Sequence, residues 1–477
     1  MTIPSSVTIL GGHCFDPDID IHFAENSAFT KDDQGIIYNA QRTRLILILS
    51  EKDSYSIPST IEEIYAFAFG SILKLTTIIF EENPNLKIIF NYAFNICPNL
   101  KNIDIPDSVS TIEQYAFNGC VSLKTMKFGK SLEYIHDNAF RDCEHIELIE
   151  FSECNKATIG AYSFNNCKNL KRIVFANNIT KIGKNCFSNC ISLSDVIFPS
   201  SLEYIDMFAF SRTGILNVSF PSDSKLISLG VGCFSECRNL SYISLPQSVN
   251  EIQQSCFELT NISSFVVPNH TEYISDYAFK DCFNLRTFTI PSNCSLRRFG
   301  NLFFEGCSSL SVIECPHSEW FCVDVGALYN KNETELICFP PASDIKFFNL
   351  PQTLETISSG AFIGCKNLVS ISIASNSVKT IKQYAFANCS SLTFINIPIC
   401  VQNIESSIFI GCNKLRCGVI IENRTTSFIK RIISVCLLNP KAIFDCDILS
   451  CQCIRIHSSI TSHILYSFSI IFYLGIF

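Results

Sequence analysis

The sequence contains little tryptophan, methionine or charge. Its 477 residues include 1 Trp and 3 Met, and Asp, Glu, Lys and Arg together make up 17% of the chain. The net charge is −8 and no dense run of Lys and Arg occurs, so the basic stripe that nucleic-acid backbones require is missing. We therefore expect no nucleic-acid partner.

Motifs that carry catalytic chemistry are missing as well. The chain has no GxGxxG, GxxxxGK[ST] or HExxH motif. Its 8 His residues are scattered, and none recurs beside a nucleophile and a carboxylate in a repeated frame. We predict that the protein is not an enzyme and that it binds no cofactor and no metal.

Apolar residues of a few types are abundant instead. Hydrophobic residues make up 47% of the chain, with 41 Phe and 26 Cys. A narrow choice of apolar residues indicates one template used many times. The chain is also too long for one ordinary core, which favours a repeat array or several domains.

A repeat of about 23 residues follows the pattern IPxSVxxIxxxAFxxCxxLxxIxI, as in residues 105–128. Between Phe69 and Phe304 its Phe recurs every 22 to 25 residues, a period within the range of leucine-rich repeats. The copies of this Phe are Phe15, Phe69, Phe94, Phe117, Phe140, Phe164, Phe187, Phe210, Phe234, Phe257, Phe279, Phe304, Phe362, Phe386 and Phe409.

Each repeat predicts short strands and one turn. The LxxIxI segment ends in alternation, so its Ile side chains point inward from a short strand. The VxxI segment after Pro and Ser predicts a second short strand or an extended turn. The AFxxC segment places Phe and Cys on one face of a short helical turn. No repeat can fold alone, so we predict a leucine-rich-repeat solenoid of about 14–15 stacked turns over residues 1–421.

Two inserts, residues 16–56 and 316–349, interrupt the period. The first contains Gly-Ile-Ile-Tyr-Asn at 35–39 and the second contains Gly-Ala-Leu-Tyr-Asn at 326–330. Each is followed by an apolar residue, Pro and a fresh repeat. We predict that each insert is a β-hairpin-like extra turn that continues the stack with different side chains.

Both ends of the chain bear on its location. The N-terminus, which starts Met1-Thr2-Ile3, has neither the charged segment nor the apolar core of a secretory signal. Residues 422–477 form a non-repeat apolar tail, and residues 459–477 are uncharged and just long enough to span a bilayer. Their β-branched and aromatic content also fits a strand, so a membrane anchor and a strand-like or poorly ordered tail both stay open.

The repeated AFxxCxxLxxIxIPxSVxxI pattern and the GxLYN insert resemble the BspA-like class of leucine-rich repeats over residues 3–421. This resemblance implies a surface antigen of the kind found in bacteria and parasitic protists, which contacts host cells, matrix proteins or other microbes. It thus implies a protein-binding adhesin at the cell surface. The alternative is a cytoplasmic scaffold for protein–protein interaction, which the missing signal favours.

Fifteen of the 26 cysteines occupy repeat positions, eleven of them three residues after the Phe. Other copies place Thr, Ile, Ala or Ser there, so we predict small buried apolar residues rather than metal or disulfide ladders. Near the end, Cys451 and Cys453 with His457 lack the spacing of a zinc site. So many free thiols favour a reducing compartment.

The outward side chains of the LxxIxI strands are the candidate recognition surface. They mix charged, aromatic and small polar residues on a fixed geometry, as protein-binding faces do; a merely solvated sheet face is the alternative. Trp320, in the second insert, is either a contact or an anchor that packs the insert onto the stack. The candidate partner contacts are Arg172, Tyr242, Trp320 and Phe394.

Overall fold

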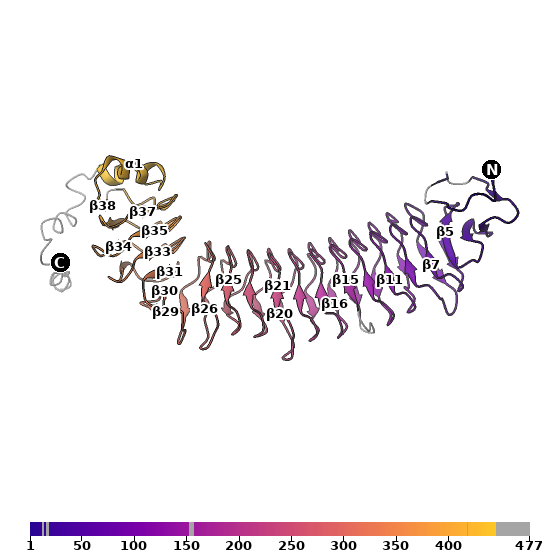
Figure 1. Cartoon of the computed structure of the whole chain (residues 1–477), viewed down its shortest axis with the longest axis horizontal. Coiled ribbons are helices and arrows are strands. Elements are labelled where there is room, and N and C mark those ends of the chain that lie inside the picture. Colours follow the sequence, from indigo (N-terminus) through magenta and orange to yellow (C-terminus); the bar gives the residue numbers. More distant parts are fainter. Residues whose placement is uncertain (12–13, 16–18, 152–156, 417, 445–477) are drawn as a thin grey trace. The chain divides into compact units, whose positions relative to one another are not determined.

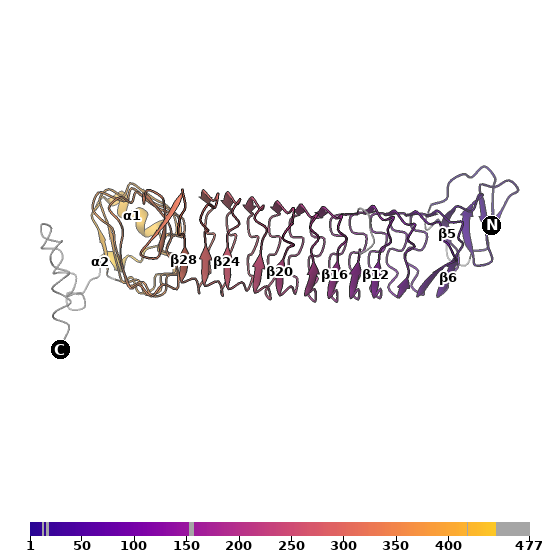
Figure 2. The same cartoon turned by 90° about the horizontal axis from the view of Figure 1, so that it is seen from below.

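A computed structural model describes residues 1–11, 14–15, 19–151, 157–416 and 418–444. The chain divides into two compact units, Met1–Cys307 and Ser308–Phe477. Within each unit, successive turns lie side by side in a solenoid (Figures 1 and 2). The predicted fold class is confirmed.

Two ladders of short parallel strands run along unit 1. The LxxIxI strands of neighbouring turns pair in register, for example Thr125 with Leu148 and Lys127 with Glu150. These strands are β6 (Ser54–Ile57), β8 (Thr77–Phe80), β10 (Asn102–Ile103), β12 (Thr125–Lys127), β14 (Leu148–Glu150), β16 (Arg172–Val174), β18 (Asp195–Ile197), β20 (Asn217–Ser219), β22 (Tyr242–Ser244), β24 (Ser264–Val266) and β26 (Thr287–Thr289). Hydrogen bonding along this row is interrupted between β10 and β12, between β18 and β20 and between β22 and β24. We call the row the LxxIxI sheet.

The VxxI segments form the second ladder of unit 1, the VxxI sheet. Its strands are β7 (Glu63–Ile64), β9 (Ile88–Ile89), β11 (Thr111–Ile112), β13 (Tyr134–Ile135), β15 (Thr158–Ile159), β17 (Lys181–Ile182), β19 (Tyr204–Ile205), β21 (Ser228–Leu229), β23 (Glu251–Ile252), β25 (Tyr273–Ile274) and β27 (Arg298–Phe299). The N-terminal region adds β1 (Thr2–Ile3), β2 (His22–Phe23), β3 (Phe29–Lys31), β4 (Ile36–Asn39) and β5 (Arg44–Ile48). The predicted LxxIxI strand is therefore present, and the VxxI segment forms a short strand rather than an extended turn.

Unit 2 repeats this plan. Its LxxIxI strands are β28 (Val312–Glu314), β32 (Phe347–Asn349), β34 (Ser370–Ser372), β36 (Phe394–Ile397) and β38 (Val419–Ile421). Its VxxI strands are β33 (Thr356–Ile357), β35 (Thr380–Ile381) and β37 (Asn403–Ile404), preceded by β29 (Phe321–Asp324), β30 (Ala327–Asn330) and β31 (Glu335–Cys338).

A column of stacked phenylalanines fills the core of each unit. Phe117, Phe140 and Phe164 are 0% exposed, and their ring centroids lie 5.0 and 5.1 Å apart. From Phe69 to Phe304 the rings of neighbouring turns lie 4.7 to 6.1 Å apart, within the range of favourable aromatic pairs. The period of the sequence therefore corresponds to one buried ring per turn.

The AFxxC segment is a hydrogen-bonded turn where we predicted a short helical turn. In the Phe117 copy, the amides of Asn118 and Cys120 donate to carbonyls three residues back, while the amide of Phe117 donates across to Ala139 at 2.7 Å. Tyr115 and Gly119, two residues before and after the Phe, have φ of 58° and 73°. These left-handed residues prevent a helix and turn alternate amides toward the next turn of the solenoid.

Both inserts are antiparallel hairpins at the edge of the VxxI sheet. β3, β4 and β5 join β7, and β29, β30 and β31 join β33. Phe339 then occupies the Phe position of the column, with its ring 5.4 Å from that of Phe362. The inserts therefore continue the stack, as predicted, and add turns that the count of Phe copies left out.

The Asn of the GxLYN motif closes each insert hairpin. The side-chain oxygen of Asn330 accepts the amides of Thr334 and Glu335 at 2.8 and 2.9 Å, and its nitrogen donates to the Thr334 hydroxyl. Asn39 makes the equivalent bonds to Thr43 and to the amide of Arg44. This motif is thus a local turn device.

A helix follows the last turn of unit 2. α1 (Thr426–Ser434) buries Phe428 and Ile432, and α2 (Lys441–Phe444) follows it. The amide of Phe409 donates to the carbonyl of Cys436 at 3.0 Å, so the chain after α1 takes the place of another turn. α1 thereby covers apolar surface that the final repeat would expose. The residues proposed as a membrane anchor, 459–477, lie outside the described residues.

Candidate recognition surface

Alternate side chains of each LxxIxI strand point outward in two columns. In β12, Thr125 and Lys127 are exposed while Met126 between them is 1% exposed. Because neighbouring strands lie about 4.8 Å apart, each column presents one side chain roughly every 4.8 Å along the unit. The face therefore has a regular backbone and a varied set of side chains.

Charged side chains on this face pair between turns. Arg172 on β16 lies 3.2 Å from the carboxylate of Asp195 on β18, and Lys127 lies 3.3 Å from Glu150. All four side chains remain at least a quarter exposed, so each pair contributes about 0–1 kcal/mol. The face from β12 to β18 thus carries charged side chains, and each of these charges is paired with an opposite charge on the next strand.

From β20 to β26 the outward side chains carry no charge. Tyr242 is 53% exposed and Val266 is 57% exposed. The outward residues of these four strands are Asn217, Ser219, Tyr242, Ser244, Ser264, Val266, Thr287 and Thr289. Solvent-exposed apolar groups among small hydroxyl side chains make this part of the face easy to desolvate.

Within neither unit does the structure bring the predicted contacts together. Arg172 and Tyr242 lie on the LxxIxI sheet of unit 1, with the turns of β18 and β20 between them. Trp320 is 47% exposed at the start of the β29 hairpin, which belongs to the VxxI sheet of unit 2. Phe394 is half-buried on β36 of the LxxIxI sheet. The two candidates of each unit are therefore separate points on that unit.

Trp320 takes part in the hairpin through its backbone. Its amide donates to the Ser318 hydroxyl at 3.1 Å, and its carbonyl accepts the Lys331 amide at 2.7 Å. The indole is nevertheless about half exposed. The backbone thus anchors this residue, while the side chain is accessible to a partner.

Sequence reasoning missed Phe347 on this face. It lies on β32 and is 72% exposed, while its neighbour Phe348 is 4% exposed. Residues 316–349 were assigned to an insert, so their strand register could not be inferred from the repeat. The pattern Phe-Phe-Asn-Leu-Pro before a fresh repeat was the signal for an LxxIxI strand.

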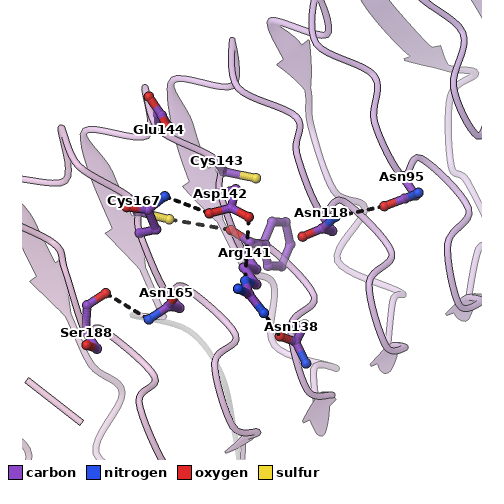
Figure 3. Close-up of polar contacts among 12 residues, drawn as sticks. Asn95, Asn118, Asn138, Arg141, Asp142, Cys143, Glu144, Asn165, Cys167 and Ser188 are labelled. Carbon is purple, nitrogen blue, oxygen red and sulfur yellow. Dashed lines mark hydrogen bonds and ion pairs between the residues drawn. The ribbon is translucent and has the colours of Figure 1, made fainter. Parts of the chain in front are cut away.

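Polar side chains of the AFxxC turns contact one another along one side of the stack (Figure 3). There the Asn118 amide donates to the Asn95 side-chain oxygen at 2.9 Å, and Asn165 donates to the Ser188 carbonyl at 3.1 Å. Arg141 bonds the Asn138 side-chain oxygen at 3.3 Å. Polar groups on this side thus bind one another between and within turns, which stabilises the stack.

The repeat cysteines are buried and donate hydrogen bonds. The thiol of Cys120 donates to the Phe94 carbonyl at 3.0 Å, and that of Cys143 donates to the Phe117 carbonyl at 3.1 Å. Where Thr replaces Cys, the Thr213 hydroxyl donates to the Phe210 carbonyl at 2.9 Å. Most copies therefore fill the slot with a residue that donates to a Phe carbonyl, whereas Ile72 fills it by packing alone in the Phe69 copy. This extends the predicted role as buried packing residues.

Burial also sets the chemistry of these thiols. It raises the pKa of Cys237 from 9.0 to about 11 and that of Cys338 to about 12. All cysteines that the structure describes are free, and Cys14 is the exposed one among them. Buried, protonated thiols react slowly with oxidants, so the abundance of cysteine does not by itself favour a reducing compartment.

The described part of the chain contains neither a metal-binding cluster nor a membrane-spanning helix. No three His, Cys, Asp or Glu side chains there lie close enough together to hold a metal ion. Nor does any helix there have the length and apolar character needed to cross a bilayer. The cluster of Cys451, Cys453 and His457 lies outside this part.

The short parallel strands, the buried ring in every turn and the outward columns define a leucine-rich-repeat solenoid. The family model of the BspA type leucine rich repeat region (6 copies) matches residues 50–171, 157–286, 204–320, 250–345 and 332–445. The chain therefore belongs to the BspA type leucine-rich-repeat family, as the resemblance predicted.

One of the similar solved structures shows the same fold. A leucine-rich repeat protein from Bacteroides ovatus is 22% identical with a TM-score of 0.58, and the match covers 90% of this chain and 98% of that one. A leucine rich cell surface protein from Faecalibacterium prausnitzii is 21% identical with a TM-score of 0.46, covering 84% and 96%. The pneumococcal vaccine antigen PcpA is 16% identical with a TM-score of 0.40, covering 83% and 82%. No curated protein matches the chain.

Proposed function

We propose that this protein is a non-enzymatic adhesin or surface antigen that binds host or matrix proteins through its LxxIxI face. The observation that carries the proposal is the uncharged, partly apolar stretch from β20 to β26, beside a charged stretch whose ions are paired. Family membership supports it, since proteins of this class are commonly surface antigens.

Binding is tested with the full chain immobilised against purified host and matrix proteins. We expect Tyr242→Ser and Val266→Ser to weaken capture of a bound protein, because both side chains are exposed on the uncharged stretch. Phe283→Ser, a change at another exposed residue away from the strands, is the matched control. If Tyr242→Ser and Val266→Ser capture the protein as well as the control Phe283→Ser does, the result contradicts binding through this face.

Location is tested separately on intact cells. A membrane-impermeant biotin reagent labels exposed lysines, and this chain offers many of them. We expect labelling of this protein in intact cells. Labelling that occurs only after lysis would favour the alternative, an intracellular scaffold.

A further inference from the structure

Two aromatic side chains stand two strands apart on the LxxIxI sheet of unit 2. Phe347 on β32 pairs with Ser370 on β34, and Ser370 pairs with Phe394 on β36. Phe347 is 72% exposed and Phe394 is half-buried. The two aromatic residues therefore flank the small side chain of Ser370 in the same outward column.

The distance between Phe347 and Phe394 leaves room for one more aromatic ring between them. Neighbouring strands lie about 4.8 Å apart, so the two phenylalanines are separated by roughly 9.6 Å. A ring placed above Ser370 would lie about 4.8 Å from each, within the range of favourable aromatic pairs. The inner column of the same turns shows this arrangement filled, since the rings of Phe339, Phe362 and Phe386 lie 5.4 and 5.2 Å apart.

The site is small and bounded. Neither Phe347 nor Phe394 contacts another ring within the described residues. On the side where the strands end, the Asn396 side chain bonds the amide and carbonyl of Ile373 at 2.7 Å, so it closes that side with a fixed polar group. We call the space over Ser370 between the two rings the aromatic slot.

Basic side chains lie on the opposite side of the slot, where the strands begin, and they indicate the charge of the partner. Two exposed basic residues lie in the segments that lead into β32 and β34, and two more lead into the neighbouring strand β38, against one acidic residue, Asp344. Within the described residues none of the four makes an ion pair, whereas Lys379 and Lys382 on the VxxI strands pair with glutamates at 2.7 and 2.9 Å. The four are Lys346, Lys366, Lys414 and Arg416.

We infer that the aromatic slot binds one aromatic side chain of a partner protein, carried by a segment with acidic residues next to it. The ring stacks between Phe347 and Phe394 over Ser370, and the acidic residues face the basic edge. This inference rests on the proposed function as a protein-binding solenoid and names the chemistry that one part of it recognises.

The test uses the full chain and labelled ten-residue peptides of Asp, Glu, Gly and Ser with one central Phe, Tyr or Trp. Matched peptides carry Ala at the centre or Lys in place of the acids. Fluorescence anisotropy should give a Kd about tenfold lower for the acidic aromatic peptides, because two ring contacts are gained. The difference should shrink as salt rises.

Ser370→Phe is the decisive variant, because its own ring fills the slot. It should abolish the preference for aromatic peptides, and Phe347→Ser should reduce it. Phe283→Ser, at an exposed aromatic residue of unit 1 that lies away from the strands, is the matched control and should leave peptide binding unchanged. Thermal melting checks that each variant folds.

Two outcomes overturn the inference: acidic aromatic peptides that bind no better than their matched peptides, or equal binding by Ser370→Phe. If a matrix protein is still captured by the intact chain in that case, the proposed function stands and only the slot is wrong. If the peptides bind as expected but no host or matrix protein is captured, the proposed adhesin function fails and the slot stands.

Discussion

Removing one ring from the buried column is the sharpest test of how the solenoid is held together. Phe140 is 0% exposed, stacks on Phe117 and Phe164 at 5.0 and 5.1 Å, and meets Phe128 edge-on at 5.7 Å. Phe140→Ala removes the ring and leaves a cavity that the turns on either side cannot close. We expect the free energy of unfolding to fall by about 3–5 kcal/mol.

This loss is a large share of the ~5–15 kcal/mol by which folded proteins are usually stable. Each turn contacts mainly its neighbours, so the damage should be local. Urea unfolding followed by far-UV circular dichroism gives the energy. Hydrogen exchange measured by mass spectrometry should show faster exchange around residues 116–164, centred on the changed turn.

Phe283→Ala is the matched control, because Phe283 is 52% exposed and its loss should cost about 0.5 kcal/mol or less. If Phe140→Ala costs no more than this control, the stacked rings do not hold the turns together. Faster exchange spread evenly over the chain would also contradict the nearest-neighbour argument.

Three further predictions follow from single contacts. Because burial raises the pKa of Cys237 from 9.0 to about 11, its folded form keeps the proton longer, so stability should fall as pH rises from about 9 to 11; urea midpoints across this range, with reductant present, check this. Arg172→Ala should cost at most about 1 kcal/mol, and less in high salt, since its pair with Asp195 is half exposed; a larger loss measured by urea unfolding would be inconsistent with a surface pair. Asn330→Ala should destabilise the insert hairpin by about 1–3 kcal/mol, because two backbone amides lose their acceptor. Unfolding followed by the fluorescence of the single Trp measures this loss, and Asn332→Ala at the exposed neighbouring position should change little.

The buried architecture could be predicted from the sequence because its signals are local and repeated. Phe117 and Phe140 occur at the same place in copies of one pattern, so a stack of equivalent turns must place them in one column. Alternation around Met126 places it inside and its neighbours outside. The inserts were recognised by their shared GxLYN pattern and their place before a fresh repeat.

The outer surface could not be predicted to the same degree. Arg172 is exposed as expected, but only the structure shows that Asp195 neutralises it one strand away. Trp320 was grouped with Phe394, yet the two residues lie on different sheets of unit 2. Which side chains meet on neighbouring strands depends on the register between turns. A repeat pattern that is interrupted by inserts does not give this register.

What the sequence by itself determined is the repeating core: a period of about 23 residues, one buried Phe per turn and the LxxIxI strand, because burying apolar surface at a fixed spacing leaves one stable way to stack. What only the tertiary structure decided is which side chains meet outside that core. The left-handed residues of the AFxxC turn, the thiol bonds to Phe carbonyls and the slot between Phe347 and Phe394 all depend on atoms of adjacent turns. Those distances are set by backbone pairing between segments more than twenty residues apart, and no local pattern carries them.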